Sequence, residues 1–510
     1  MTDYVEKLEK RIKPNWKTAF WAVIVVGLVA HMYKFTNTLL NHDSLFSIYS
    51  KMNMSSSGRW FLLPACGISS YYDLPWLNGV LSLIYAAMTA AVIAEIFDIK
   101  EKHILILSGA LLISFPSITN TFFYEFTADG YMLAMLLAAL AVRFSMIGDN
   151  KPWHLLAAVL CICFSCGIYQ AYVSFALLLA LGHFMWEILN NRYENKEYYR
   201  WILRQVLVFA FGMLAYYIIW KLCLHFGGGS AGSYLGLDSL GQESAGFMAL
   251  ISSGIKSTAR GLANFFLGRN VFQYGWTLYA VLNVVFLLTS AAVLITAVIK
   301  EKLYKRLAHL VLFLLCIIAT PIFAFIWNFV RVSGSYHLVM LQSLSIVYIF
   351  TLILSQKYLK KSPRALAALL FAVLAFKFTV QANVCYFEMD KSAERTRTMA
   401  TEIVTRVHEL DEGNVEKFAI VGGSEVSLAS LNQEKSGEIM VNAHQITDNL
   451  IFDHPHGGAY LTEISGIGYP GVSEGELGEL ENSPQVMDMP TWPHKGSVAV
   501  IDNVAVIKLS

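Results

Sequence analysis

Residues 17–35 read KTAFWAVIVVGLVAHMYKF, an apolar run long enough to cross the hydrocarbon core of a bilayer as a helix. The run is too long for a secretory signal peptide and lacks a small-residue cleavage site, so we expect it to remain as an anchor. LNHDSLFSIY follows at 40–49 and places His42 and Asp43 where the chain leaves the membrane. The sequence therefore predicts polar side chains at a membrane surface, followed at once by another apolar stretch.

The composition of the whole chain extends this interpretation. Of its 510 residues, 56% are hydrophobic and only 15% are charged, whereas soluble domains carry about a quarter charged residues. The net charge of +1 and the lack of a basic arm give no indication of a nucleic-acid partner. Most of the seven cysteines lie in apolar runs and are expected to be core residues rather than metal ligands. The chain is thus predicted to be a mainly α polytopic membrane protein.

Apolar stretches of spanning length, about 20 residues each, recur along the chain and predict eleven transmembrane helices. Because this number is odd, the two termini are expected on opposite sides of the membrane. The predicted spans are residues 17–35, 76–97, 103–118, 130–147, 153–168, 170–189, 205–226, 278–299, 306–329, 338–355 and 363–380.

The distribution of lysine and arginine sets the orientation of these spans. The N-terminal segment and every second loop after it hold 21 of them in total, and the alternate loops hold 7. By the positive-inside rule the N-terminus is cytoplasmic. The three long segments, 36–75, 227–277 and 381–510, then lie outside, and we expect the protein to act there.

The last long segment has the composition of a soluble domain. Residues 389–412 carry apolar positions at helical spacing, and 417–422 read as a short buried strand. Near the end, two strand patterns flank Asp502 and Asn503, which is typical of a tight hairpin. We therefore expect a transmembrane domain over 1–380 and a small extracytoplasmic α/β domain over 381–510.

The tail also contains the sequence Asp453-His454-Pro455-His456. Histidine and aspartate are metal ligands, but two histidines around a proline in a loop are more often solvated. The solvated loop is the preferred interpretation, and no residue is assigned to a metal; whether a divalent metal takes part is left open.

Polar and ionisable residues gather at the predicted outer ends of the helices. Such groups cost about 2.5–3.5 kcal/mol at the centre of a membrane, so they need a partner or a function. Residues from distant parts of the chain are expected at one depth, which predicts a binding cavity that opens outward. The candidates are His42, Asp43, Arg59, Glu125, Asp129, Tyr169, Gln170, Lys221, His225, Arg331 and His337.

Simpler interpretations exist for some charged residues in these regions. Interfacial lysines often extend to lipid headgroups, which we expect of Lys34 and Lys51 and consider equally for Lys221. Glu125 and Asp129 are four residues apart, on one face of a helix, and one of them is alternatively a helix cap.

In the loop 36–75 apolar residues recur at helical spacing, with serines and a lysine between them. This pattern predicts an amphipathic helix lying in the membrane interface. Asp43 stands at its start, where an N-cap is the alternative, simpler role, although capping and catalysis do not exclude each other. The apolar residues are Leu45, Phe46, Ile48, Tyr49, Met52 and Met54.

The order of several motifs resembles the serotype-converting type II O-antigen glucosyltransferases of bacteria and phages, a family of GT-C type. The resemblance spans nearly the whole chain. The motifs are HDSL at 42–45, GRW at 58–60, FTADGYMLAMLLAALAV at 126–142, CGIYQAYVSFAL at 166–177 and MPTWPHKGSVAVIDNVAVIKL at 489–509.

The resemblance implies transfer of a hexose, typically glucose, from a polyprenyl-phosphate donor to a cell-surface polysaccharide such as O-antigen. The reaction would take place on the outer side of the bacterial cytoplasmic (inner) membrane. The implied partners are the lipid-linked donor, the polysaccharide acceptor, membrane lipids, a small flippase and a donor-synthesising transferase. No DxD motif occurs in the chain, which agrees with a lipid-linked donor rather than a nucleotide sugar.

The resemblance also suggests roles for the acidic candidates. The first-loop acid of the family falls on Asp43, which would act as general base on the acceptor hydroxyl or orient it. The acid that precedes the fourth span falls on Asp129, which the resemblance implies is a second catalytic residue.

The basic and neutral candidates would contact the substrates. Arg331 and Arg59 are candidates to bind the leaving phosphate, because a guanidinium makes paired hydrogen bonds to phosphate oxygens. Arg331 is the better placed of the two, beside the bilayer where a lipid phosphate would lie. Tyr169 and Gln170 would contact sugar hydroxyls.

Two other functions remain open at this point. A polysaccharide polymerase or ligase would use the same outer loops and differ in whether the lipid carries one sugar or a repeat unit. A lipid-linked sugar transporter or flippase should show inverted repeats and helices broken near the midplane. The sequence contains no internal repeat.

Overall fold

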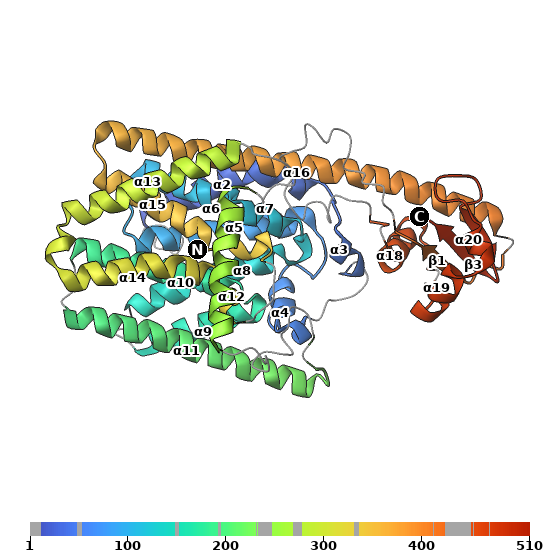
Figure 1. Cartoon of the computed structure of the whole chain (residues 1–510), viewed down its shortest axis with the longest axis horizontal. Coiled ribbons are helices and arrows are strands. Elements are labelled where there is room, and N and C mark those ends of the chain that lie inside the picture. Colours follow the sequence, from blue (N-terminus) through green and yellow to red (C-terminus); the bar gives the residue numbers. More distant parts are fainter. Residues whose placement is uncertain are drawn as a thin grey trace, which may run out of the picture.

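The computed structural model describes residues 12–47, 54–147, 152–191, 195–230, 232, 247–268, 278–330, 336–411, 413–423, 450–451, 453–468 and 470–510. Most helices run along the long axis of the molecule and form a bundle, and a smaller unit lies beyond one end of it, with three strands in its described part (Figure 1).

The first half of the bundle has seven α-helices among the described residues. They are α2 (Pro14–Thr36), α3 (His42–Ser47), α4 (Leu62–Cys66), α5 (Pro75–Ile96), α6 (Lys102–Ser114), α7 (Pro116–Phe122) and α8 (Glu125–Ile147), with the 3-10 helix η1 (Ser55–Ser57) between α3 and α4.

The second half consists mainly of longer helices. They are α9 (Pro152–Ile168), α10 (Tyr172–Asn190), α11 (Asn195–Phe226), α12 (Phe247–Phe266), α13 (Leu278–Lys300), α14 (Leu307–Ala324), α15 (Leu344–Tyr358) and α16 (Lys361–Leu410), with the 3-10 helices η3 (Leu303–Lys305), η4 (Ile326–Phe329) and η5 (Leu338–Leu341).

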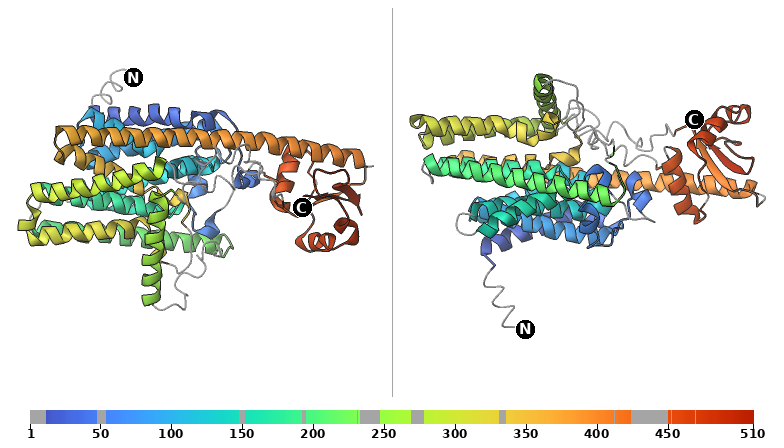
Figure 2. Two further views of the ribbon diagram at one scale, coloured as in Figure 1. Left: turned by 45° about the horizontal axis from the view of Figure 1, so that its top comes forward. Right: turned by 90° about the horizontal axis from the view of Figure 1, so that it is seen from below.

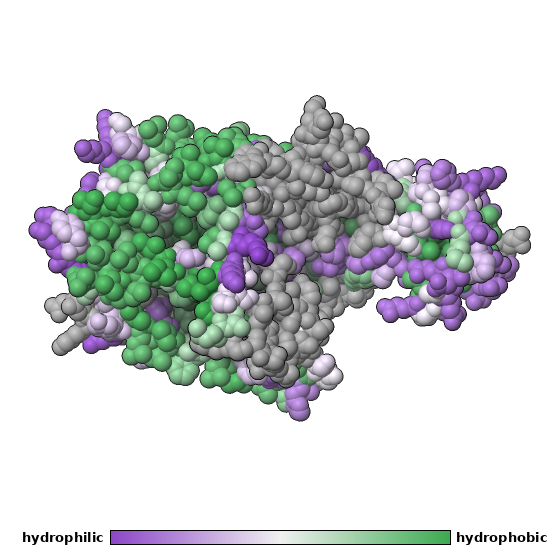
Figure 3. All heavy atoms as spheres, in the orientation of Figure 1, coloured by the Kyte–Doolittle hydropathy of each residue, from purple (hydrophilic) through white to green (hydrophobic). Residues whose placement is uncertain are grey.

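Nine helical segments among the described residues are long and apolar enough to cross a membrane. They coincide with nine of the predicted spans. The remaining two predictions, 103–118 and 153–168, correspond to the bent pair α6–α7 and to the 17-residue helix α9. The bundle surface seen in Figure 3 is largely hydrophobic. Large apolar side chains of the bundle, such as Trp21 (60% exposed) and Phe376 (69% exposed), are exposed. This surface is that of a protein embedded in lipid.

The span predicted over 103–118 is not one continuous helix but the bent pair α6–α7. α6 ends at Ser114, and α7 begins at Pro116 and is bent from it by 46°. Proline lacks an amide hydrogen and disfavours helical backbone in the residue before it, so Phe115 is extended (ψ 139°). The break redirects α7 across the end of the bundle.

α12 lies within the segment 227–277, which was predicted only as a long outer loop. It runs across the other helices and projects from the bundle (Figures 1 and 2). It contacts η4 and α14 through two glycines: a Cβ at Gly254 would lie 2.7 Å from Phe329, and one at Gly261 would lie 2.6 Å from Phe325.

α16 is one continuous helix of 50 residues that leaves the bundle and continues along the small unit (Figure 1). The last predicted span, 363–380, and the predicted amphipathic helix, 389–412, are therefore parts of the same helix. The small unit contains α18 (His454–Ser465), α19 (Glu474–Glu481) and α20 (Pro484–Met487).

The sheet of the small unit has the order β1–β3–β2. β1 (Lys417–Val421) is parallel to β3 (Val504–Lys508), and β2 (Val498–Ile501) is antiparallel to β3. Asp502 and Asn503 join β2 to β3 with φ angles of 48° and 62°, as a tight hairpin turn requires. The predicted strand and hairpin are confirmed.

Candidate active site

A cavity of about 410 Å³ lies at the end of the bundle that faces the small unit. It is formed by α3, η1, α7, the first turns of α8, the turn before α10 and the residues around η5. Its walls combine a carboxylate, a guanidinium, imidazoles, hydroxyls and an amide. The lining residues are His42, Asp43, Met54, Ser56, Ser57, Arg59, Asn120, Tyr124, Phe126, Thr127, Tyr131, Tyr169, His337 and Val339. A second cavity of about 450 Å³, between α10, α11 and α14, has a mostly apolar lining that includes no charged residue.

The structure brings five predicted site residues into this one cavity, although they span almost 300 positions of the sequence. They are His42, Asp43, Arg59, Tyr169 and His337.

Asp43 lies in the first turn of α3, and its side chain is 39% exposed. Its Oδ1 is 3.6 Å from Nε2 of His42. The N-cap of α3 is Asn41, whose Oδ1 accepts a hydrogen bond of 2.9 Å from the amide of Ser44. The alternative role of Asp43 as the cap is therefore wrong, and its carboxylate faces the cavity without being needed to start the helix.

The predicted interfacial helix is only partly described, because Ile48, Tyr49 and Met52 lie outside the described residues. In the described part, Leu45 is 3% exposed and belongs to the core of the small unit. Met54 follows in a separate segment and lines the cavity. The expectation that this apolar side faces lipid is thus wrong for Leu45.

Two tyrosines hold the guanidinium of Arg59. Its Nη1 donates a hydrogen bond of 3.1 Å to the hydroxyl of Tyr131, and its Cζ lies 4.7 Å from the ring centre of Tyr169. The two rings are stacked with centroids 4.7 Å apart. The cation is therefore fixed on an aromatic surface inside the cavity.

Gln170 does not line the cavity but supports the turn that carries Arg59. Its Nε2 donates hydrogen bonds of 2.9 Å to the carbonyl of Ser57 and to the hydroxyl of Tyr216. Gly58, between Ser57 and Arg59, has a φ of +78°, and a Cβ there would lie 2.4 Å from both the Gln170 amide and the Tyr216 hydroxyl. The turn thus requires glycine for its backbone angle and for space.

Gly58→Ala is expected to destabilise the protein by more than Gly228→Ala. Gly228 also has a positive φ, +65°, but nothing lies within 4 Å of a Cβ there. Left-handed backbone costs an alanine about 1–2 kcal/mol, and only Gly58→Ala adds the collision. Thermal unfolding of both variants in detergent measures the difference, and equal shifts would contradict this description of the turn.

Several polar residues of the cavity were not among the predicted candidates, and Asn120 is the most informative of them. Asn120 is 1% exposed, and its Nδ2 makes no hydrogen bond to any described residue. It lies in α7, so the break at Pro116 brings it to the cavity. The polar residues directly after that proline, in PSITNT, were the available signal. An unsatisfied buried amide that lines a cavity favours a polar ligand there.

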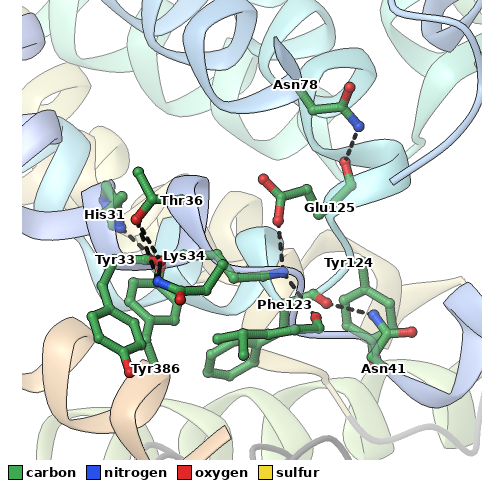
Figure 4. A network of polar contacts seen from close by, with 12 residues as sticks. His31, Tyr33, Lys34, Thr36, Asn41, Asn78, Phe123, Tyr124, Glu125 and Tyr386 are labelled. Carbon is green, nitrogen blue, oxygen red and sulfur yellow. Dashed lines mark hydrogen bonds and ion pairs between the residues drawn. The ribbon is translucent and has the colours of Figure 1, made fainter. Parts of the chain in front are cut away.

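Glu125 and Lys34 form a buried ion pair (Figure 4), and neither residue lines the cavity. Nζ of Lys34 lies 2.6 Å from Oε2 of Glu125, and both side chains are 1% exposed. The same Nζ donates a hydrogen bond of 2.9 Å to the carbonyl of Leu39. The expectation that Lys34 extends to lipid headgroups is therefore wrong. Its side chain instead links the end of α2 to the start of α8.

Asp73 lies close to this ion pair, in the turn before α5. Burial raises the pKa of Asp73, and the nearby positive charge of Lys34 opposes that rise. Lys34 therefore acts on two buried carboxyl groups at once.

Lys34→Met is expected to destabilise the protein by about 3–5 kcal/mol, because it leaves the Glu125 carboxylate buried without its cation. Lys13→Met is the matched control, since the Lys13 side chain is 54% exposed and its partner Glu95 also binds Arg143. Exposed pairs contribute about 0–1 kcal/mol. Chemical unfolding in detergent measures both, and the double variant Lys34→Met/Glu125→Leu should recover part of the loss. Similar effects of the two single variants would contradict the assignment.

Asp129 is 1% exposed and lies beside Cys66 and Ser69 rather than in the cavity lining. Its Oδ1 accepts a hydrogen bond of 2.9 Å from the amide of Gly130. Burial and the charge of Asp129 raise the pKa of the Cys66 thiol. The carboxylate thus contacts α4, whereas its catalytic role stays a prediction.

Lys221 and His225 are exposed near the end of α11 and do not line the cavity. Lys221 Nζ lies 5.3 Å from the ring centre of Trp220, and the ring of His225 lies 5.2 Å from that of Phe226. Arg331 and Lys51 lie outside the described residues.

The predicted solvated loop at 453–456 is instead the N-cap and first turn of α18. Nδ1 of His454 accepts a hydrogen bond of 3.1 Å from the amide of Ile420, and its Nε2 lies 3.1 Å from the carbonyl of Val472, so this imidazole joins the helix to the sheet. Within the described ranges, no three His, Cys, Asp or Glu side chains gather in a way that could hold a metal ion.

A family model described as glucosyl transferase GtrII matches residues 32–355 of the chain. The matched segment contains every residue that lines the cavity. It ends within α15, so the small unit lies outside it. No curated protein and no solved structure matches the chain.

Proposed function

The chain belongs to the GtrII glucosyltransferase family, and from this premise we propose that it transfers glucose from a polyprenyl-phosphate donor to a cell-surface polysaccharide. The observation that carries the proposal is the single cavity in which Asp43 and Arg59 lie together, lined also by hydroxyls and the Asn120 amide. A carboxylate can act as general base on an acceptor hydroxyl, and a guanidinium can stabilise the charge that develops on a leaving phosphate.

Arg59 is suited to bind the phosphate of the donor. Its guanidinium is held by Tyr131 and Tyr169 and can form paired hydrogen bonds to phosphate oxygens as negative charge develops on them. Stabilising that charge at the leaving group lowers the barrier to transfer. His337, on the same cavity, is a further candidate to contact the phosphate.

Asp43 is suited to act on the acceptor. In the proposed step the acceptor hydroxyl oxygen forms a bond to C1 of the sugar and loses its proton to the Asp43 carboxylate. The bond between C1 and the phosphate oxygen breaks, and its electron pair leaves with the polyprenyl phosphate. His42, 3.6 Å from Asp43, adjusts the orientation of the carboxylate. Asp129, buried against α4, is assigned a positioning role.

The proposed site faces the outer side of the bacterial cytoplasmic (inner) membrane, with the N-terminus in the cytoplasm and the small unit outside. The distribution of lysine and arginine supports this orientation. A donor made in the cytoplasm must then be supplied by a donor-synthesising transferase and a flippase, which are the proposed partners.

The break between α6 and α7 is also a feature of transporters, and it is the specific observation that favours a flippase as second candidate. In the described part of the chain only this pair is bent, and it borders a cavity at one end of the bundle rather than at its midplane.

A polymerase or ligase would use a lipid that carries a whole repeat unit.

The proposal is tested by incubating the purified protein with radiolabelled polyprenyl-phosphate glucose, nucleotide-linked glucose or a lipid-linked repeat unit. Polysaccharide released from the source cells serves as acceptor. We expect label in the polysaccharide only from polyprenyl-phosphate glucose. The proposal would be contradicted if the protein neither transferred glucose from that donor nor hydrolysed it. It would also be contradicted if only the repeat unit were transferred.

A further inference from the structure

α3 contributes to two parts of the molecule at the same time. His42 and Asp43 line the cavity, whereas Leu45, two residues later, is buried in the core of the small unit together with Ile403 and Leu461. The helix that carries the proposed base therefore packs directly on the unit that lies outside the family match.

The first turn of α18 meets α3 at this contact. The ring of His456 lies 4.9 Å from that of Phe46 and 5.8 Å from that of His42, measured between centroids. Nδ1 of His456 is 2.7 Å from Oδ1 of Asp453, which also accepts a hydrogen bond from the His456 amide as N-cap of α18. Phe46 is 41% exposed and the Asp453 side chain 40%, so a ligand can reach both. We call Phe46, Asp453 and His456 the α3–α18 junction.

We propose that the α3–α18 junction is the acceptor subsite, which binds a sugar ring of the polysaccharide next to the sugar that presents its hydroxyl to Asp43. This inference rests on the proposed function. A pyranose ring has C–H faces that pack on aromatic rings and hydroxyls that bond to carboxylates and imidazoles. The junction offers both kinds of contact directly beside the residues that line the cavity.

The charge of the junction favours the acceptor over the donor. α3 and the segment 453–456 contain the carboxylates Asp43 and Asp453 and no lysine or arginine. A lipid phosphate would be repelled there, whereas a neutral sugar would not. The phosphate is instead accommodated at Arg59.

The position of the junction agrees with binding of the acceptor there and of the donor phosphate at Arg59. It lies where α3 of the bundle meets α18 of the small unit (Figure 1). A water-soluble polysaccharide can approach from that side, whereas the lipid chain of the donor stays with the apolar surface.

Steady-state transfer with the full-length protein tests the inference, using polyprenyl-phosphate glucose as donor and acid-released cell-surface polysaccharide as acceptor. Phe46→Ala and His456→Ala are each expected to raise the KM for the polysaccharide about threefold to tenfold, the loss of one ring contact. The KM for the donor should stay near that of the wild type. Asp453→Asn keeps an N-cap residue while removing the charge, and should also raise the acceptor KM.

His494→Ala is the matched control, because His494 is an exposed histidine of the same unit that does not belong to the junction. It should leave both KM values unchanged. An acceptor KM that stays at the wild-type value in both Phe46→Ala and His456→Ala would overturn the inference while leaving the proposed function intact. A wild-type protein that neither transfers nor hydrolyses the donor would instead overturn the proposed function.

A second measurement, on more conservative variants, is used if the alanine variants do not fold. Saturation-transfer NMR with the same released polysaccharide reports binding without turnover, and Phe46→Leu and His456→Gln preserve most of the side-chain volume. Weaker saturation transfer than in the wild type supports the acceptor subsite. Saturation transfer as strong as in the wild type, in both folded variants, would overturn the assignment of the acceptor subsite.

Discussion

Asp43→Asn is expected to lower the transfer rate by about 10² to 10⁴-fold, the usual contribution of a general base. Asparagine keeps the shape of the side chain but cannot take the proton from the acceptor hydroxyl. Since Asn41, not Asp43, caps α3, the substitution should leave the helix in place. The loss should therefore appear in kcat, with the melting temperature close to that of the wild type.

Asp98→Asn provides the matched control for this variant. The Asp98 side chain is 54% exposed, the residue follows α5, and its φ of 52° is one that asparagine adopts readily. Transfer should be unaffected there. A folded Asp43→Asn protein that retains full activity would remove Asp43 from the mechanism and direct attention to Asp129.

Arg59→Lys is expected to lower kcat/KM for the donor by about 10² to 10³-fold, although it keeps the positive charge. An ammonium cannot form the planar, paired hydrogen bonds of a guanidinium or lie flat on Tyr169. Initial rates at low donor concentration, measured with a saturating amount of polysaccharide, give this value.

Arg200→Lys, at an exposed position near the start of α11, controls for the general effect of the exchange and should be neutral. If Arg59→Lys were as active as the wild type, Arg59 would not bind the phosphate. Arg331, the other arginine predicted for this role, would then be the candidate.

The parts of the fold that follow from local patterns could be predicted from the sequence. Long apolar runs located the spans, because a helix that crosses lipid must satisfy its own backbone and needs a fixed length. The hairpin at Asp502 and Asn503 followed from turn chemistry. The break before α7 was missed, because Pro116 lies inside an apolar run that was interpreted by hydropathy alone.

The site was predicted less completely, because its residues meet only through tertiary packing. The common predicted depth of the polar residues indicated one cavity, and the structure places five of them in its lining: His42, Asp43, Arg59, Tyr169 and His337. Depth alone does not show which side of a helix a residue occupies, so exposed Lys221 and His225 were included as well.

Other features depend on pairs of residues that are distant in sequence. Lys34 was interpreted without its partner Glu125, which is 91 positions away, and so was placed at lipid headgroups. The contact between Phe46 and His456 joins segments 410 positions apart, and no local pattern indicates it.

A structure of the protein with a non-hydrolysable phosphonate analogue of polyprenyl-phosphate glucose tests the central claim most directly. We predict that the phosphonate lies against Arg59 and that the sugar lies in the cavity beside Asp43. The face of C1 to which the acceptor hydroxyl would bond should be directed toward the α3–α18 junction. A phosphonate bound away from Arg59, or a sugar bound outside the cavity lined by Asp43, would contradict the account.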